Sequence, residues 1–183
     1  MISPSKGTLL IANPFLKDAN FTRTVIFMCE HREEGSLGLV INKIFPQKLN
    51  ELILDFEKKD LITFDGGPVQ KNSFQFLHQY PDLIPGGEKV LEGTYWGGNF
   101  ESLTIHLKNN NIDLQKIKFF IGYSGWASGQ LDQEITENTW LTVKATNDLI
   151  FKVSPNEIWK ASLKELGGDY EMMINFPLDP QMN

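Results

Sequence analysis

The stretch that decides the fold is residues 117–135, which read IKFFIGYSGWASGQLDQEI. From Ile117 to Tyr123, apolar side chains recur at every second position, and this period predicts a β-strand. Leu131 and Ile135 are then spaced as on one face of a helix. Small residues fill the junction, where they permit a sharp bend. The stretch therefore predicts a strand that turns directly into a helix, with Ser128 as the helix cap.

The first half of the chain predicts mainly β-strands. Short apolar runs rich in β-branched and aromatic residues alternate with turns that contain glycine, proline or polar residues. The run at residues 22–31 is apolar on both faces, which is typical of a central strand, and it forms a predicted hairpin with the next run over residues 23–43. The predicted strands are residues 7–12, 22–31, 37–42, 61–65, which run into a Gly66-Gly67-Pro68 turn, and 73–78, with a later strand at residues 140–145.

Two shorter segments have helical periodicity. Residues 48–56 place apolar side chains on one face, and Asn99 is positioned to cap a helix over residues 100–107. Between these segments, residues 80–99 are rich in proline and glycine and predict turns. Residues 172–183 contain two prolines and predict a segment that wraps the surface or frays.

The clearest local signal is the helix predicted over residues 154–166. Ser154 and Glu157 match a capping box, in which each side chain bonds to the backbone N–H of the other end. Pro155 suits the first helical position, and Gly167 supplies a stop. Together with the strands, these helices predict an α+β (mixed α/β) fold.

Length and composition bound the organisation of the chain. It has 183 residues, of which 41% are hydrophobic, enough for one compact core. No internal repeat and no linker-like shift in composition interrupt it. We therefore predict a single domain over residues 1–183.

Charge and cysteine content exclude several classes of function. A net charge of -6 and a pI of about 5.1 do not favour direct binding to nucleic acid or to anionic membranes, which both attract basic surfaces. Cys29 is the only cysteine, so no disulfide can form within the chain, which fits a reducing cytosol. No apolar run approaches the length of a signal peptide core or a membrane span. We predict a cytoplasmic protein that does not bind membranes.

Two residues are candidate nucleophiles. Ser124 follows Gly122-Tyr123, but the glycine after it comes one residue too early for the Gly-x-Ser-x-Gly elbow of hydrolases. Cys29 and His31 share one face of the predicted strand, although a cysteine on an apolar face is usually a small buried hydrophobe. We predict no catalytic residue, and keep a hydrolase that uses Ser124 or Cys29 as the alternative.

The sequence indicates no cofactor and no metal ion. The three histidines are dispersed, and no clustered carboxylates accompany them. The glycines of the stretch fit neither the phosphate-binding loop of nucleotide hydrolases nor the dinucleotide-binding pattern. A helix that begins near Ser128 leaves only a generic anion site at its N-terminus, and the simpler interpretation is a helix with nothing bound.

The aromatic residues beside the glycines have two interpretations. Tyr123 and Trp126 lie next to glycines, and such rings are common in binding pockets and interfaces. The same rings also fill cores against bare glycine backbone. Both interpretations stay open from the sequence.

Five motifs that occur in order resemble the YqgE/AlgH family. They are GTLLIANP, FTRTVIFM, GSLGLVIN, DGGPV and GYSGWASGQLDQEI. The resemblance implies a compact bacterial cytosolic domain with a bifurcated β-sheet folded into a pseudo-barrel, flanked by helices. It brings the label of transcriptional regulator but no established reaction. The matching motif positions are Gly66, Gly67, Pro68, Val69, Gly122, Tyr123, Gly125, Trp126, Gly129, Gln130 and Leu131.

The sequence departs from the family pattern in two places. Ala127 and Ser128 stand where the family commonly has Gly-Pro, and Ser124 stands where it often has alanine. An alanine could not act as a nucleophile, which weakens the hydrolase alternative.

We therefore predict a non-catalytic binding or regulatory protein that contacts a small molecule or a protein near the glycine and aromatic motifs. The sequence leaves the ligand and the oligomeric state open. The predicted binding residues are Gly66, Gly67, Pro68, Tyr123, Ser124, Gly125, Trp126 and Gln130.

Overall fold

The computed structural model describes residues 1–16, 18–53, 56 and 61–174. The strands are β1 (Thr8–Ala12), β2 (Val25–Arg32), β3 (Gly35–Val40), β4 (Thr63–Asp65), β5 (Val69–His78), β6 (Glu88–Leu91), β7 (Thr94–Trp96), β8 (Ile117–Ala127) and β9 (Trp140–Lys144). The helices are α1 (Leu49–Leu52), α2 (Phe100–Lys108), α3 (Gln130–Thr136), α4 (Asn147–Phe151), α5 (Pro155–Leu166) and α6 (Asp169–Met173), with a 3₁₀ turn over Leu114–Lys116.

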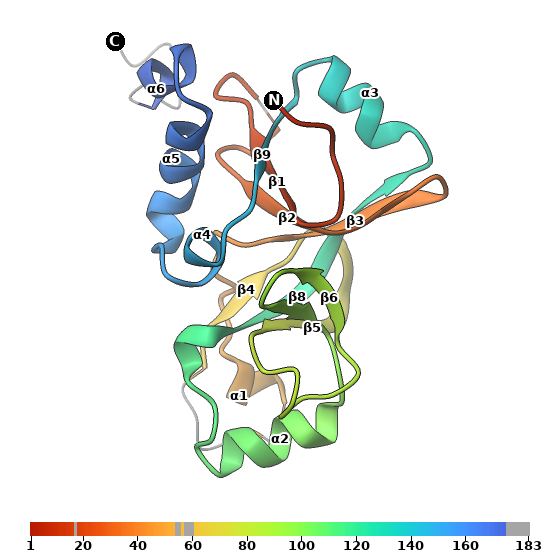
Figure 1. Ribbon diagram of the computed structural model, residues 1–183, viewed down its shortest axis with the longest axis vertical. Coiled ribbons are helices and arrows are strands. Elements are labelled where there is room, and N and C mark those ends of the chain that lie inside the picture. Colours follow the sequence, from red (N-terminus) through yellow and green to blue (C-terminus); the bar gives the residue numbers. More distant parts are fainter. Residues whose placement is uncertain (17, 54–55, 57–60, 175–183) are drawn as a thin grey trace.

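The nine strands form one curled sheet, a half-barrel with helices around it (Figure 1). The strand order is β6-β7-β5-β8-β3-β2-β1-β9, and β4 pairs with β8 outside this path. Most neighbours are antiparallel, but β4 runs parallel to β8. The predicted α+β class, with its bifurcated sheet and flanking helices, is confirmed.

Strand β8 is where the sheet divides. Its residues 119–121 pair with both β4 and β5, which therefore lie on opposite edges of β8. Beyond residue 122, the edge that held β4 pairs instead with β3, through Ser124 and the residues that follow. The chain between β4 and β5 must therefore cross β8 to reach its other edge.

The crossing is possible only because glycines meet there. A Cβ atom on Gly66 would lie 2.3 Å from the Gly122 carbonyl oxygen, and one on Gly67 would lie 2.3 Å from the Tyr123 carbonyl carbon. Gly122 itself has a φ of 71°, which favours glycine. We call Gly66, Gly67 and Gly122 the glycine crossing.

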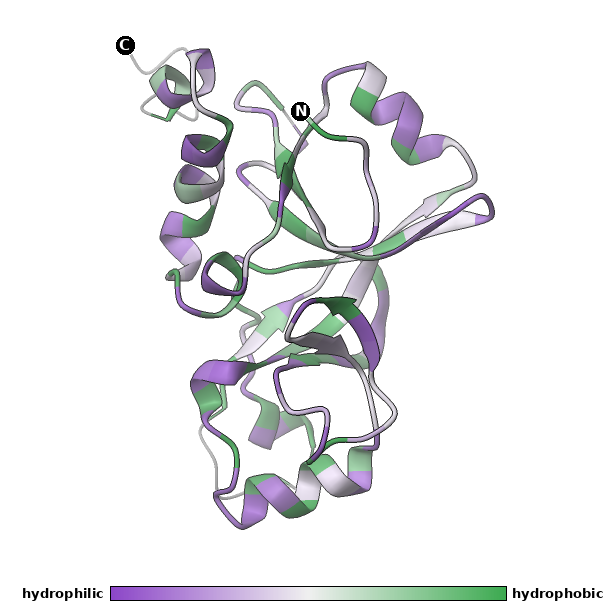
Figure 2. Ribbon diagram, in the orientation of Figure 1, coloured by the Kyte–Doolittle hydropathy of each residue, from purple (hydrophilic) through white to green (hydrophobic). Residues whose placement is uncertain are grey.

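Three apolar clusters fill the space between the sheet and the helices, and Figure 2 shows hydrophobic residues concentrated on the strands. Helix α5 packs Ile158, Trp159 and Leu163 against one face of the sheet, over β1 and β2. Helix α2 covers the far end of β5 and β8, through Leu103 and Leu107. Helix α3 covers the remaining face beside β3 and β8.

Most predicted strands are confirmed, including the hairpin of β2 and β3. The helix over residues 48–56 is shorter than predicted, because Ile53 is already extended after α1, and residues 54–55 lie outside the described residues. The turn-rich prediction for residues 80–99 missed the β6–β7 hairpin. Helix α4 was also missed. Of residues 172–183, the first two end α6 and residues 175–183 lie outside the described part.

Helix caps match the predictions unevenly. Asn99 caps α2 through its side chain, which accepts a bond from the Ser102 N–H at 2.7 Å. Helix α5 begins at Pro155 as predicted, but the capping box does not form, since the Ser154 side chain makes no cap bond and its carbonyl accepts from Glu157 instead. The predicted cap at Ser128 is wrong.

Helix α3 begins in a different way. Gly129 occupies the cap position with a φ of 71°, a conformation that serine adopts rarely. The Gln130 side chain then reaches back to accept a hydrogen bond from the Ala127 N–H at 3.0 Å. The strand also continues to Ala127, so the bend comes later than the sequence indicates. The glutamine, rather than the serine, closes the junction.

Candidate functional site

The two aromatic residues of the GYSGW motif point to opposite faces of β8. Trp126 packs in the cluster beneath α3, whereas Tyr123 packs against the cluster on the other side of the sheet. Ser124 is on the Trp126 face, since alternate residues of a strand share a face. The eight predicted binding residues therefore do not form one site.

A pocket of about 270 Å³ opens on the Trp126 face. We call it the tryptophan pocket. Five of the predicted binding residues line it, and they come from the turn before β5, the end of β8 and the start of α3. The lining residues are Leu16, Asp18, Phe21, Pro68, Ser124, Gly125, Trp126, Gln130, Glu134, Thr139 and Trp140.

Glu134 organises the wall of the tryptophan pocket. Its Oε2 accepts hydrogen bonds from the indole N–H groups of Trp126, at 2.8 Å, and Trp140, at 2.7 Å. Its Oε1 accepts a third bond, at 2.9 Å, from Gln130. Because Gln130 is also bonded to the Ala127 N–H, the helix, the strand and both indoles are held together. The pocket wall is therefore fixed before any ligand arrives.

The aromatic rings pack edge to face. The centroids of Trp126 and Trp140 lie 6.2 Å apart at an interplanar angle of 83°. Phe21 meets Trp140 at 5.5 Å and 79°. Trp126 and Trp140 are 7% and 2% exposed, so both are core residues that also form a wall of the pocket. Trp126 is therefore both a core residue and part of the pocket lining, the two interpretations that the sequence left open.

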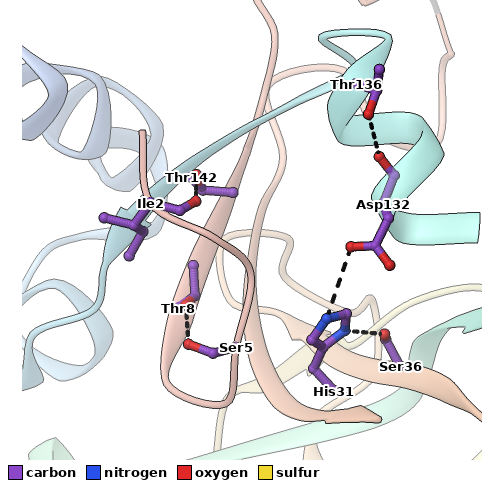
Figure 3. Close-up of polar contacts among 8 residues, drawn as sticks. All are labelled: Ile2, Ser5, Thr8, His31, Ser36, Asp132, Thr136 and Thr142. Carbon is purple, nitrogen blue, oxygen red and sulfur yellow. Dashed lines mark hydrogen bonds and ion pairs between the residues drawn. The ribbon is translucent and has the colours of Figure 1, made fainter. Parts of the chain in front are cut away.

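A second polar cluster joins the β2–β3 hairpin to α3 (Figure 3). The Nδ1 atom of His31 lies 2.7 Å from the Ser36 hydroxyl oxygen, and its Nε2 lies 4.0 Å from a carboxylate oxygen of Asp132. Ser36 is nearly buried, whereas Asp132 is largely exposed. These three residue types in contact are those of a serine-histidine-aspartate triad. No local sequence pattern indicated this cluster, because Asp132 is distant along the chain from His31 and Ser36.

The comparisons with known proteins agree with this fold. The profile of the AlgH-like family matches residues 9–171. This chain belongs to the AlgH-like family. A "UPF0301 protein" of Chlorobium chlorochromatii is 42% identical over 177 residues, covering 97% of this chain and 94% of the relative. A "UPF0301 protein" of Bacteroides thetaiotaomicron is 40% identical over 184 residues, covering 100% and 93%.

Two solved structures are similar to this AlgH-like chain. The solution structure of the AlgH protein from Pseudomonas aeruginosa superposes with a TM-score of 0.73 at 28% identity, covering 97% of this chain and 98% of that one. The crystal structure of a Corynebacterium diphtheriae protein gives a TM-score of 0.80 at 20% identity, covering 96% and 94%. The second likeness concerns the fold alone.

The glycines of the family motifs have a structural role in this AlgH-like chain. Gly66 and Gly67 form the crossing and do not line the tryptophan pocket. The Gly66 carbonyl accepts bonds from the Val40 N–H at 2.9 Å and from the Ser124 hydroxyl at 3.3 Å. Of the Gly-Gly-Pro turn, only Pro68 reaches the pocket.

Tyr123 lines a different concavity, a depression of about 590 Å³ beside the β2–β3 hairpin. Its lining includes Glu30 and Arg32, and it shares Gly125 and Trp126 with the tryptophan pocket. Charged residues make up much of its rim, and two of them, Arg32 and Glu30, are paired at 2.8 Å. Tyr123 is therefore not part of the tryptophan pocket.

Neither predicted nucleophile has the surroundings of a catalytic residue. Ser124 is 1% exposed, and its hydroxyl donates to the Gly66 carbonyl rather than to an imidazole. Cys29 is fully buried, and burial, reinforced by the charges of Glu88 and Glu30, raises the pKa of its thiol well above 9.0. A buried thiol with a raised pKa is a poor nucleophile.

The predicted proximity of Cys29 and His31 is wrong. A β-bulge between Met28 and Glu30 shifts the register of β2 against β3. His31 pairs with Ser36 and so falls on the face of Met28, while Cys29 stays in the opposite apolar cluster. One inserted residue reverses the face of every later side chain.

Two features of the described residues bear on cofactors and membranes. Within those residues, no group of three or more histidine, cysteine, aspartate or glutamate side chains is placed to hold a metal ion. Among the helices that the structure describes, none has both the length and the apolar character to span a bilayer.

The sequence missed half of the pocket, above all Glu134 and Trp140. One signal was available for Glu134, since it lies four residues after Gln130 and so on the same face of α3. Asp18 and Phe21 come from the loop after β1, which has no periodic pattern.

Proposed function

We infer that this AlgH-like protein is a non-catalytic binding or regulatory module, and that its ligand site is the tryptophan pocket. The observation that carries the proposal is the convergence of Pro68, Trp126 and Gln130, from three separate elements, on one pocket. The network around Glu134 supports it, because a preorganised wall lowers the cost of binding. A small concave site with a few fixed polar groups is typical of ligand recognition.

The proposal extends to how regulation would work. With a net charge of -6, the protein is a poor candidate for direct attraction to DNA. Regulation through a bound small molecule or a protein contact fits the composition better. We also propose that residues 1–183 act as one domain in the cytosol, as composition and the single Cys29 suggest.

The test is to identify what the purified protein retains from a native cytosol. Wild type and Trp126→Phe are captured, denatured, and their released small molecules and co-purifying proteins compared by mass spectrometry. Trp96→Phe is the matched control, since its indole also donates to a side chain, Gln75 at 3.0 Å, but lies outside the pocket. We expect one species to be lost from Trp126→Phe alone.

A second variant guards against misfolding. Gln130 is exposed on α3, so Gln130→Ala changes the pocket wall without opening the core. The proposal fails if both pocket variants retain the same molecules as wild type while remaining folded by circular dichroism.

The cluster of Ser36 and His31 favours a second candidate function, acyl transfer. In such a step the Ser36 oxygen would attack a carbonyl carbon, and His31 would accept the hydroxyl proton at Nδ1 and deliver it to the leaving group. Asp132, beside Nε2, would stabilise the imidazolium.

A fluorophosphonate probe tests this second candidate, because it phosphonylates serines that an adjacent base activates. Labelling of Ser36, located by peptide mass spectrometry and abolished in His31→Asn, would support acyl transfer. Ser124→Ala is the control and should label like wild type. An unlabelled Ser36 would leave the binding module as the sole proposal.

A further inference from the structure

We propose that the tryptophan pocket recognises a small organic cation, one that carries an ammonium or guanidinium group. This inference rests on the proposed function, because it names the class of ligand for the same site. Three observations support it: the charge of the lining, the neutral hydrogen-bond donors around Glu134 and the aromatic walls.

The described lining of the pocket is acidic. Asp18 and Glu134 both contribute to it, and no lysine, arginine or histidine is among the lining residues that the structure describes. Asp18 accepts a hydrogen bond from the Asn20 N–H at 2.8 Å and also interacts with the ammonium of Lys43, which lies outside the lining. With two carboxylates and no cationic side chain in the described lining, the pocket attracts a cation and repels a phosphate or carboxylate ligand. The pocket is therefore a poor site for nucleotides or organic acids.

Glu134 has hydrogen bonds but no counter-charge from the residues that the structure describes. Its three donors are the indoles of Trp126 and Trp140 and the amide of Gln130, all of them neutral. No described residue forms an ion pair with it. A carboxylate offers about four acceptor sites, so room remains for one further donor. A half-buried carboxylate in this state is stabilised by a bound cation.

The aromatic walls suit the same ligand. Phe21, Trp126 and Trp140 line the pocket, and the negative face of an indole attracts ammonium and guanidinium groups more than other rings do. The N–H bonds that reach Glu134 lie in the ring planes, so the carboxylate engages the indoles by their edges. A cation can thus contact a ring and the carboxylate together.

The size of the pocket limits the ligand. A volume of about 270 Å³ lies just below the range of about 300–1,000 Å³ that is usual for small-molecule sites. It suits a linear diamine or a decarboxylated amino acid with a guanidinium group rather than a nucleotide or a folded peptide.

The experiment measures binding of two probes, putrescine and agmatine, to the full chain by isothermal titration calorimetry. We expect both to bind wild type at millimolar concentration or below, and agmatine more tightly, because a planar guanidinium stacks on indole rings. Glu134→Gln should weaken binding at least about tenfold. Glu137→Gln is the matched control, because Gln133 donates to Glu137 at 2.8 Å as Gln130 does to Glu134, but Glu137 is exposed and outside the pocket.

Asp18→Asn is the second variant, because it removes a pocket charge without touching the Glu134 network. It should weaken both probes several-fold while the thermal unfolding midpoint stays close to that of wild type. Equal affinity of wild type, Glu134→Gln and Asp18→Asn would overturn the cation inference, as would no binding of either amine.

Two further arms separate this inference from the proposed function. The neutral 1-butanol and the anionic butyrate are titrated alongside; a neutral or anionic ligand that binds only with Trp126 intact would overturn the cation inference and leave the binding module standing. A capped tripeptide with a central arginine tests the other source of a guanidinium. If the peptide binds and the free amines do not, the occupant is a protein side chain, and the small-molecule inference is overturned.

Discussion

Two neighbouring regions of β8 use the same short motif in opposite ways. At the glycine crossing, backbones approach so closely that no side chain fits. A few residues later, at the tryptophan pocket, large side chains leave a space of about 270 Å³. The glycine crossing leaves no space for a ligand, whereas the tryptophan pocket contains space that no side chain fills. The contrast teaches that a recurring motif can serve the fold through its glycines and a ligand through its aromatic residues.

The largest expected effect comes from filling the crossing. In Gly67→Ala, the new Cβ would lie 2.3 Å from the Tyr123 carbonyl carbon and 2.4 Å from the Ser124 nitrogen, at a φ of 145°. Because these neighbours are backbone atoms of a central strand, we expect a loss of more than about 4 kcal/mol or no folding at all. Urea unfolding followed by circular dichroism measures it.

Gly86→Ala is the control for that change. Its φ of 81° also favours glycine, but nothing lies within 4 Å of the added Cβ. It should cost only about 1 kcal/mol, the penalty of a left-handed alanine. Equal losses in both variants would mean that conformation, and not close approach, explains the crossing.

The next effect concerns the pocket wall. Glu134→Ala would leave the indole N–H groups of Trp126 and Trp140 without an acceptor, and each buried unsatisfied donor costs about 1–3 kcal/mol. We expect the free energy of unfolding to fall by about 2–4 kcal/mol. Glu137→Ala, on the exposed side of α3, should change it by less than about 0.5 kcal/mol. An unchanged free energy of unfolding in Glu134→Ala would show that water accepts the hydrogen bonds of the two indole N–H groups instead.

A third prediction concerns Lys118, a buried charge on the part of β8 below the crossing. Its ammonium lies 4.4 Å above the Phe64 ring and has no ion pair among the described residues, and burial lowers its pKa from 10.5 to about 8. Lys118→Met should raise the free energy of unfolding at pH 7 by about 2 kcal/mol, because it removes the cost of burying the charge.

The lowered pKa of Lys118 also predicts how the free energy of unfolding changes with pH. Below pH 8, Lys118 is protonated in both the native and the unfolded state, and the native state bears the full cost of burying the charge. Between pH 8 and 10.5, Lys118 is protonated in the unfolded state but neutral in the native state. Wild-type stability therefore rises with pH in this window, and the advantage of Lys118→Met shrinks. The exposed Lys116→Met is the control and should show no such trend. A constant difference between wild type and Lys118→Met would contradict the lowered pKa.

The contrast between the two regions also explains how far the sequence could predict the molecule. Short apolar runs identified β1, β2 and β3, because a strand that is buried on both faces is apolar at successive positions. Alternating apolar residues identified β8. The crossing was not predictable, since it depends on β4 and β5 taking opposite edges of β8. Nor was the bulge after Met28, which moved His31 to the other face. Such features arise from pairing between distant segments.

The pocket was predictable only in part, for a related reason. Trp126 and Gln130 lie in the motif, and the i, i+4 spacing on α3 leads from Gln130 to Glu134. Phe21 and Asp18 join them because the loop after β1 places Phe21 against Trp140 of β9, and no local pattern encodes that contact.

The smallest predicted effect is that of replacing Ser124, which belongs both to the glycine crossing and to the tryptophan pocket. Its hydroxyl donates to Gly66 at the crossing, and the residue also lines the pocket. The bond is long, at 3.3 Å, and Gly66 keeps a second donor in the Val40 N–H. Ser124→Ala should therefore cost only about 0.5–1 kcal/mol, measured by urea unfolding. It should leave agmatine affinity within about twofold, because the charge of Glu134 is untouched. A large loss of affinity without a loss of stability would instead show that the Ser124 hydroxyl contacts the ligand. The hydroxyl that bonds to the Gly66 carbonyl would then serve both the fold and the binding site.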